Sequence, residues 1–208
     1  MLLALDVDGV ILNFDSFYSQ FAYKKFGVRI QDKTAWNMNR RYGLSDSQDK
    51  EVWRMINESN WTGLPFFDDT KQAVKIINQL QSKHGSDLEV IFVSSFNQKY
   101  FNGRFHDLQC AGFNIDKHQL IACGSNAGNK SKLDFIKVEN IDWFVDDRVT
   151  NLYDVSPISK HLIHINRGYS EDGDNEKIQI IKQQSKFHSV NGLLDFVENI
   201  LLDYILDR

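Results

Sequence analysis

The chain has 208 residues, a mass of 24.2 kDa and a formal net charge of -4 at neutral pH. This length supports one well-filled hydrophobic core with a small insertion. The acidic balance excludes the broad basic face that long nucleic acid requires. It does not exclude a small anionic substrate, because a metal ion or a few local cations can make the electrostatic potential within a pocket positive.

Neither the cysteines nor the hydropathy pattern indicates secretion or membrane insertion. The two cysteines, Cys110 and Cys123, predict no disulfide framework and favour buried thiols in a reducing compartment. The chain enters an apolar run without the basic region, long apolar region and cleavage site of a signal peptide. No apolar run approaches the length of a membrane span. We therefore expect a cytoplasmic protein with no membrane partner.

The first stretch of the chain combines an apolar run with two acids. Residues 2–5 predict a buried strand, and Asp6, Asp8 and Gly9 follow it directly. Open α/β sheets place their chemistry at the carboxyl ends of such strands. Two carboxylates this close repel each other unless a cation or a proton lies between them. Taken alone, the pattern is equally typical of an Asp-Gly turn that merely ends a strand.

The segment 15–75 predicts helices and no strand. Aromatic residues recur at helical spacing from Phe14 to Phe26, and Gly27 can end that helix. Ser45 is a candidate N-cap for a second helix to about residue 57. A third helix ends at Gly85. We interpret 15–75 as a helical cap inserted above the active edge of the sheet, and 1–14 with 76–208 as the core.

Strands and helices alternate in the rest of the chain. Apolar runs predict strands at 88–95, 118–124, 141–147 and 161–166, with a final amphipathic helix at 190–206. Buried strands separated by helices predict a parallel sheet covered on both faces, an α/β, Rossmann-like three-layer α/β/α architecture. The polar stretch GYSEDGDNEK (168–177) predicts a mobile surface loop.

Polar side chains follow the predicted strands at positions that meet along one edge of such a sheet. Carboxylates, hydroxyls and an ammonium group suit phosphoryl transfer, because one acid attacks phosphorus, another moves a proton and the remaining groups hold phosphate oxygens. Further acids suit Mg²⁺. The residues in question are Asp6 and Asp8, Ser94 and Ser95, Lys130 and Lys132, and Asp146 and Asp147.

In their order along the chain, DVDGV, the VSS ending at Ser95, a downstream lysine and the acids after WFV resemble the four motifs of haloacid dehalogenase superfamily phosphatases. The resemblance covers most of the chain, including the position of the cap. It implies that Asp6 is a nucleophile that forms an aspartyl-phosphate, and that Asp8 protonates the leaving oxygen and later activates water. Ser94 and Ser95 would bind phosphate.

The same resemblance implies a Mg²⁺ site. Asp6, Asp146 and Asp147 would be metal ligands, and Asp8 would contact the ion through its backbone carbonyl. A lysine would neutralise charge on the phosphate. Lys130 fits the spacing slightly better, and Lys132 is the alternative.

Within that superfamily the chain is most similar to the 5'(3')-deoxyribonucleotidase-like group, on the evidence of Phe14 after DVDGV, the stretch NWTGLPFFDDTKQAV, and VDDR with Arg148. This similarity implies a nucleoside monophosphate substrate whose base packs on cap aromatics. Phe14 and Trp61, with Trp36 and Trp53, are stacking candidates, although aromatic residues at helical spacing are more often core. Arg104, Arg148 and Arg167 are either substrate contacts or solvated surface residues.

Several alternatives stay open. The same chemistry serves a sugar phosphate or a nucleic-acid end phosphate, and the fold also supports a non-catalytic binding module. An ATP-binding loop at 124–131 lacks the glycine required before Lys130. The expected partner is a small phosphorylated substrate, a nucleotide first, with no long nucleic acid; a homodimer is also considered.

Overall fold

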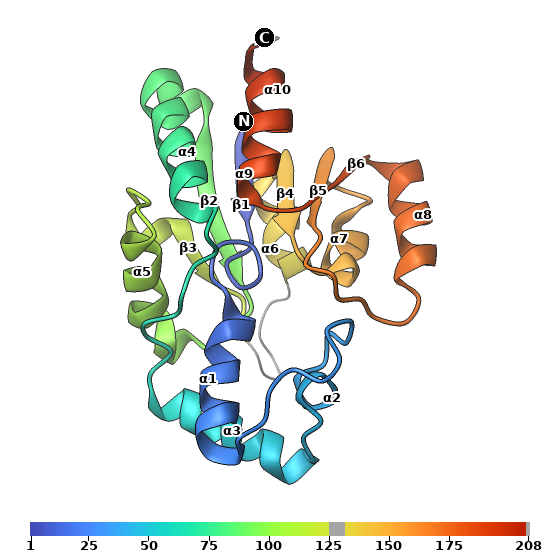
Figure 1. Ribbon diagram of the computed structural model, residues 1–208. Helices are drawn as coiled ribbons and strands as arrows, with labels where there is room; N and C mark the ends of the chain where they lie inside the picture. Colours follow the sequence, from blue (N-terminus) through green and yellow to red (C-terminus); the bar gives the residue numbers. More distant parts are fainter. Residues whose placement is uncertain (125–131, 207–208) are drawn as a thin grey trace.

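The computed structural model describes residues 1–124 and 132–206. Its centre is a six-stranded sheet in the order β3-β2-β1-β4-β5-β6, with every neighbouring pair parallel (Figure 1). The strand order reverses direction between β1 and β4, which is where ligands bind in open α/β sheets. The strands are β1 (Leu2–Leu5), β2 (Glu89–Ser94), β3 (Leu120–Ala122), β4 (Trp143–Asp146), β5 (His161–Ile165) and β6 (Lys186–Val190).

Helices cover both faces of this sheet. Leu3 and Leu5 pack into one cluster with α4 and the C-terminal helices, whereas Ala4 packs into the other with α6, α7 and α8. Because successive strand residues point to opposite faces, a strand buried on both sides must be apolar throughout. The helices are α4 (Thr70–His84), α5 (Phe101–Cys110), α6 (Lys132–Glu139), α7 (Val149–Val155), α8 (Asp174–Gln184), α9 (Leu193–Phe196) and α10 (Leu202–Leu206).

The predicted three-layer parallel α/β architecture is therefore confirmed. Short 3-10 turns lie at Gly85–Asp87, Gln98–Tyr100 and Lys117–Gln119, and a π-helical segment, Val197–Leu201, joins α9 to α10. In the described part of the chain, no helix has the length and apolar character needed to cross a bilayer.

Three helices form the segment between β1 and α4: α1 (Phe14–Phe26), α2 (Met38–Tyr42) and α3 (Asp46–Glu58). They lie beyond the carboxyl ends of the strands, at the opposite end of the molecule from both termini (Figure 1). Local signals set their limits. Gly27 ends α1 in the left-handed conformation, and Ser45 forms a capping box with Gln48 at the start of α3.

The expected domain boundary at residues 75 and 76 falls inside α4. This helix contacts α9 and the π-helical segment, so it packs with the core along its length.

The helices α2, α7 and α8 and the strand β6 were not expected from the sequence. The helices α2 and α7 have only 5 and 7 residues, α8 carries few apolar residues, and β6 is an edge strand with mostly exposed side chains.

The return from α3 to the core runs closely over α5. Asn60 and Trp61 have positive φ angles of 56° and 53°. A Cβ atom on Gly103 of α5 would lie 2.7 Å from the Asn60 carbonyl oxygen and 2.9 Å from that of Trp61. Asp107, one turn later, accepts hydrogen bonds from the backbone N–H groups of Gly63 and Leu64. Gly103 therefore permits close packing rather than interrupting the helix.

This packing predicts that Gly103→Ala lowers the free energy of unfolding by about 1–3 kcal/mol, because the methyl group collides with backbone carbonyls. In an open helix the same change stabilises by about 0.5–1 kcal/mol. Urea unfolding measures the difference, with Asn102→Ala at an exposed position of the same helix as the control. Equal stability of the two variants would contradict the packing argument.

Candidate active site

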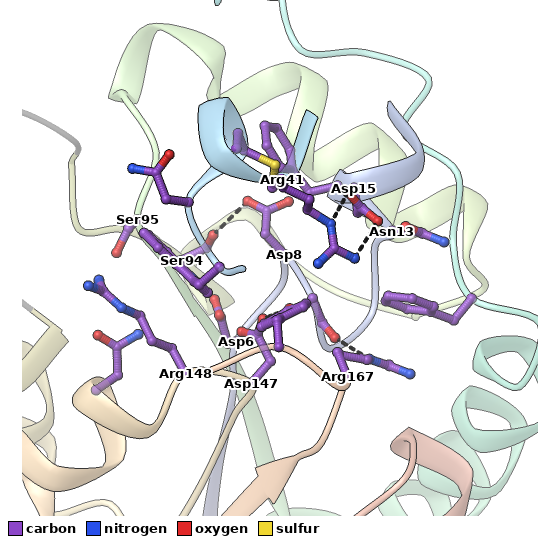
Figure 2. A pocket seen from close by; sticks show the side chains of 18 of the residues that line it. Asp6, Asp8, Asn13, Asp15, Arg41, Ser94, Ser95, Asp147, Arg148 and Arg167 are labelled. Atoms are coloured by element: carbon purple, nitrogen blue, oxygen red, sulfur yellow. Dashed lines mark hydrogen bonds and ion pairs between the residues drawn. The ribbon is translucent and has the colours of Figure 1, made fainter. Parts of the chain in front are cut away.

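A cavity of about 460 Å³ lies between the carboxyl edge of the sheet and the helices α1, α2 and α3, which we call the inserted helices (Figure 2). Its core side carries carboxylates, hydroxyls and a lysine, and its outer side carries aromatic rings with further charged groups. The core-side residues include Asp6, Asp8, Ser94, Ser95, Lys132, Asp147 and Arg148, and the outer ones include Phe14, Trp36, Arg41, Asp49, Trp53 and Trp61.

Asp6 follows β1 directly, and both backbone groups and a lysine side chain hold it in place. Its N–H donates to the Val145 carbonyl of β4, and Oδ1 accepts from the Val7 N–H at 2.7 Å. Lys132 Nζ lies 2.8 Å from Asp6 Oδ1 and 2.8 Å from Asp146 Oδ2. The ammonium group therefore joins the ends of β1 and β4.

The charged side chains of Asp6, Lys132 and Asp146 are almost completely buried. Burial raises the pKa of the Asp6 carboxyl well above its ordinary value, Lys132 opposes the rise, and Asp146 and Asp147 add to it. Burial alone would lower the pKa of Lys132, but its two carboxylate partners outweigh that effect and raise it. Lys132 is therefore held as the cation that makes the buried acids tolerable.

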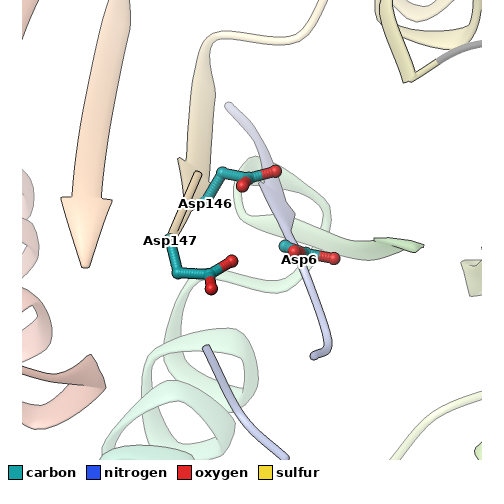
Figure 3. Close-up of side chains that lie close together, drawn as sticks. All are labelled: Asp6, Asp146 and Asp147. Carbon is teal, nitrogen blue, oxygen red and sulfur yellow. The ribbon is translucent and has the colours of Figure 1, made fainter. Parts of the chain in front are cut away.

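Asp6, Asp146 and Asp147 form an acidic cluster whose ligand atoms all lie within 4.8 Å of one another (Figure 3). Asp146 is fully buried and accepts hydrogen bonds from Lys132, the Asn151 amide and the Arg148 N–H. Its oxygens are thus largely occupied by protein donors.

Asp147 has fewer partners. It accepts from the Tyr169 hydroxyl, and it packs on the bare Cα of Gly9, where a Cβ would lie 2.1 Å from Asp147 Oδ2. Burial, followed by repulsion from Asp146, raises the pKa of the Asp147 carboxyl to about 7. The cluster therefore carries excess negative charge once Asp147 ionises.

The acidic cluster fits a divalent cation with a preference for oxygen ligands, such as Mg²⁺. Three carboxylates at short range repel one another, and the single charge of Lys132 does not cancel them. Asp6 and Asp147 are the candidate ligands with oxygens left to offer. The carboxylate of Asp8 is not part of this cluster.

Asp8 is held by a different cation. Arg104 Nη2 lies 2.7 Å from Asp8 Oδ1 and 2.8 Å from Oδ2, and Ser94 Oγ lies 3.4 Å from Oδ2. Arg104 is completely buried, and its guanidinium lies 4.8 Å from the centre of the Trp61 ring. In the described part of the chain its Nε and Nη1 have no acceptor. Asp8 is thereby coupled to the linker that returns from the inserted helices.

The turn after β1 is clamped from the loop after β5. Arg167 donates to the carbonyls of Gly9 at 2.7 Å and Val10 at 3.0 Å. Its guanidinium lies 3.5 Å from the centre of the Phe67 ring. Arg167 therefore holds the backbone that carries Asp8, and its donors point to protein rather than solvent.

The structure describes the contacts of only one of the two candidate lysines. Lys130 lies outside the described residues. Lys132 lies between Asp6 and Asp146 of the acidic cluster.

The two candidate serines both line the cavity. Ser94 is buried at the end of β2, whereas Ser95 is exposed.

The expected stacking residues are packed against one another. The Phe14 ring stacks on Trp53 and on Trp61, with centroids 5.5 Å apart in each pair. Trp61 also stacks on Tyr100 at 5.5 Å and is only 9% exposed. Trp61 therefore forms a wall of the cavity with little ring surface left for a ligand.

Arg148 on the core side of the cavity contacts Trp36 on the outer side. The Arg148 guanidinium lies 4.1 Å from the centre of the Trp36 ring. It also pairs with Glu171 through two hydrogen bonds of 2.8 and 2.9 Å. Trp36 is 37% exposed, so it offers more free ring surface than Trp61.

Tyr169 and Asn151 are among the cavity residues that the sequence analysis did not single out, as are Arg41 and Asp49. Tyr169 lies in the stretch predicted as a mobile surface loop, yet it bonds Asp147 and its ring lies 5.3 Å from the Arg41 guanidinium. Its neighbour Ser170 donates to the Thr34 carbonyl. Asn151 lies on the unexpected helix α7. An aromatic residue within a polar loop was the only signal for Tyr169, and Asn151 had none.

Comparison with known sequences gives no relative: no protein-family model matches the chain, and no curated protein does. Solved structures do resemble it. A haloacid dehalogenase-like hydrolase from Streptococcus pneumoniae superposes with a TM-score of 0.60 at 14% identity, covering 98% of this chain and 97% of that one. A Bacteroides vulgatus protein named as a candidate β-phosphoglucomutase gives 0.58 at 12% identity, covering 100% and 90%.

A Haemophilus somnus protein described as a predicted phosphoglycolate phosphatase gives a TM-score of 0.55 at 13% identity, covering 95% of this chain and 96% of that one. At such low identity these likenesses show a shared fold. The names of the three proteins give no support to the narrower similarity to 5'(3')-deoxyribonucleotidases. The chain has the fold of haloacid dehalogenase-like hydrolases.

The acidic cluster predicts that Mg²⁺ raises the thermal unfolding temperature of the protein. Saturation at about a hundred times Kd stabilises by about 2.7 kcal/mol. The ion must displace the proton from Asp147, whose pKa is about 7, so the rise should be larger near pH 8 than near pH 5.5. Thermal unfolding with and without Mg²⁺ measures it.

Asp147→Asn should lose most of this response, because it removes one ligand charge and keeps the shape. Asp87→Asn, at the opposite end of the sheet, is the control and should respond like the wild type. The same response in all three proteins would rule out ion binding at the cluster.

Proposed function

We propose that the protein hydrolyses small phosphate monoesters, with Asp6 as the nucleophile. The observation that carries this proposal is the convergence of Asp6, Asp8, Ser94, Lys132 and Asp147 on one cavity at the carboxyl edge of the sheet. These residues come from separate parts of the chain, and together they supply a nucleophile, a proton donor and a phosphate cradle.

In the first step a carboxylate oxygen of Asp6 attacks phosphorus, and the bond from phosphorus to the leaving oxygen breaks. Asp8, in its protonated form, gives its proton to the leaving alcohol. Lys132 and the Ser94 hydroxyl hold the phosphoryl oxygens as negative charge redistributes. The product of this step is an acyl phosphate on Asp6 and a free alcohol.

In the second step water attacks the same phosphorus and releases the Asp6 carboxylate and inorganic phosphate. Asp8, now a carboxylate, accepts the proton of that water. The ion pair with Arg104 fixes the position of Asp8 in the structure described here. A Mg²⁺ ion held by Asp6 and Asp147, with Asp146 behind them, would neutralise phosphate charge.

We propose that the substrate is a sugar phosphate rather than a nucleoside monophosphate, so that the leaving group is a sugar. One structural neighbour carries a name that refers to a phosphorylated glucose. The expected base-stacking residue Trp61 is largely covered by the rings of Phe14 and Tyr100, which makes a nucleotide the less favoured substrate.

A nucleoside monophosphate is the second candidate. The observation in its favour is the aromatic outer half of the cavity, where Trp36 and Trp53 offer ring surfaces to a flat group. Substrate comparison decides between the two candidates.

Asp6→Asn tests the reaction itself. With Mg²⁺ and a panel of sugar phosphates and nucleoside monophosphates, we expect the variant to lose at least about a thousandfold in kcat, because an amide does not replace the nucleophile. Phosphate release measures turnover. Failure of the wild type to release phosphate from any monoester would favour a non-catalytic binding module and overturn the proposal.

Asp8→Asn tests the proton donor separately. We expect kcat/KM for an alkyl phosphate to fall by about 10²–10⁴, the usual contribution of a general acid. For p-nitrophenyl phosphate the loss should be much smaller, because that leaving group departs without a proton. An equal loss with both substrates would contradict the role of Asp8 as the acid.

A further inference from the structure

The outer wall of the cavity contains one carboxylate that the proposed reaction does not use. Asp49 and Trp53 stand four residues apart on α3, so they share a face of the helix, and both line the cavity. Figure 1 shows α3 at the lower end of the molecule, with α1 between it and the sheet. Because Asp49 comes from α3 and Asp6 from the end of β1, we place Asp49 at the end of the cavity that would receive a leaving group.

The position of Asp49 is fixed by a buried neighbour. The Tyr18 hydroxyl donates to Asp49 Oδ1 at 2.5 Å, and Tyr18 is completely buried. Burial, reinforced by Asp49 itself, raises the pKa of Tyr18, so the hydroxyl stays a donor. In the described part of the chain no second side chain donates to Asp49, which leaves Oδ2 for a ligand.

Arg41 on the outer side of the cavity and Arg148 on its core side are both paired with acids. Arg41 binds both oxygens of Asp15 at 2.9 Å, and it also donates to the Lys33 and Ala35 carbonyls. Arg148 binds both oxygens of Glu171. Each pair cancels its own charge. For the residues described, Asp49 thus leaves this end of the cavity with one uncompensated negative charge.

We infer that Asp49 determines leaving-group specificity: it accepts hydrogen bonds from a neutral group that carries hydroxyl or amino donors, and it excludes a second anion. This inference rests on the proposed phosphatase function and narrows its substrate class. A second anionic group on the substrate would meet Asp49 and find the neighbouring guanidinium groups already occupied. Selection by repulsion accompanies selection by attraction.

The surroundings of Asp49 suit the same class of leaving group. The Trp53 and Phe14 rings, stacked at 5.5 Å, offer an apolar surface beside the carboxylate. A sugar ring presents C–H groups to such a surface and hydroxyl groups to the acid. A base with an amino group has the same combination of flat face and donor, so the two sources share one chemistry.

A matched pair of substrates tests the inference. Glycerol 3-phosphate and 3-phosphoglycerate differ by a hydroxymethyl group in place of a carboxylate. We expect the wild type to favour glycerol 3-phosphate in kcat/KM by about tenfold or more. Asp49→Asn keeps the shape and the hydrogen bond from Tyr18 but removes the charge. It should bring the two values within about threefold, chiefly through a lower KM for 3-phosphoglycerate.

Asp46→Asn is the control, because it changes the same charge on the same helix without lining the cavity. It should keep the wild-type ratio. Two further pairs separate the sources of the shared chemistry: glucose 6-phosphate against 6-phosphogluconate, and a nucleoside 5'-monophosphate against its 3',5'-bisphosphate. The pair whose ratio changes more in Asp49→Asn identifies the class of leaving group that the carboxylate contacts.

The outcomes distinguish this inference from the proposed function. Turnover by the wild type with no preference against the anionic member, or a preference unchanged in Asp49→Asn, overturns the role of Asp49 alone. Absence of turnover with every monoester, p-nitrophenyl phosphate included, removes the proposed function and this inference together.

Discussion

The ion pairs of Lys132 with Asp6 and Asp146 are the interaction on which the rest of the site depends. Two buried carboxylates at the ends of β1 and β4 would repel each other, and a cation 2.8 Å from each makes their approach tolerable. Asp147 adds a third carboxylate to the same place, and one ammonium charge does not balance all three. That imbalance makes the sheet edge a candidate site for a divalent cation, whose charge would in turn attract the oxygens of a phosphate group.

The second constraint is the coupling of Asp8 to the inserted helices. Arg104 binds Asp8 on one side and lies against Trp61 on the other, while Gly103 and Asp107 hold the linker around Trp61. Asp8, the proposed proton donor, is thereby connected to the segment that carries the outer wall. Placement of the leaving group and placement of the acid are consequently properties of one packed unit.

The sequence predicted the parts of the fold that local physics determines. Residues 2–5 had to be apolar because β1 is buried on both faces, and Gly27 and Ser45 mark helix ends through their backbone preferences. The positions of Asp6, Asp8 and the acidic pair after β4 at strand ends predicted that they meet at one edge of the sheet, whereas the roles expected of them came from the resemblance to haloacid dehalogenase superfamily phosphatases. Tyr169, Asn151 and the Arg104 pairing depend on contacts between distant segments, which no local pattern encodes. The nucleotide preference depended on aromatic residues whose mutual packing is visible only in three dimensions.

The most direct test of the central claim is chemical trapping of the acyl phosphate on Asp6. Borohydride reduction after a rapid quench converts a phosphorylated aspartate into homoserine, which mass spectrometry assigns to a position in the chain. The account predicts homoserine at position 6 when the enzyme is quenched during turnover with Mg²⁺ and substrate, and unmodified aspartate there without substrate. Homoserine at a different position, or turnover with none detected at Asp6 under conditions in which the intermediate accumulates, would contradict Asp6 as the nucleophile.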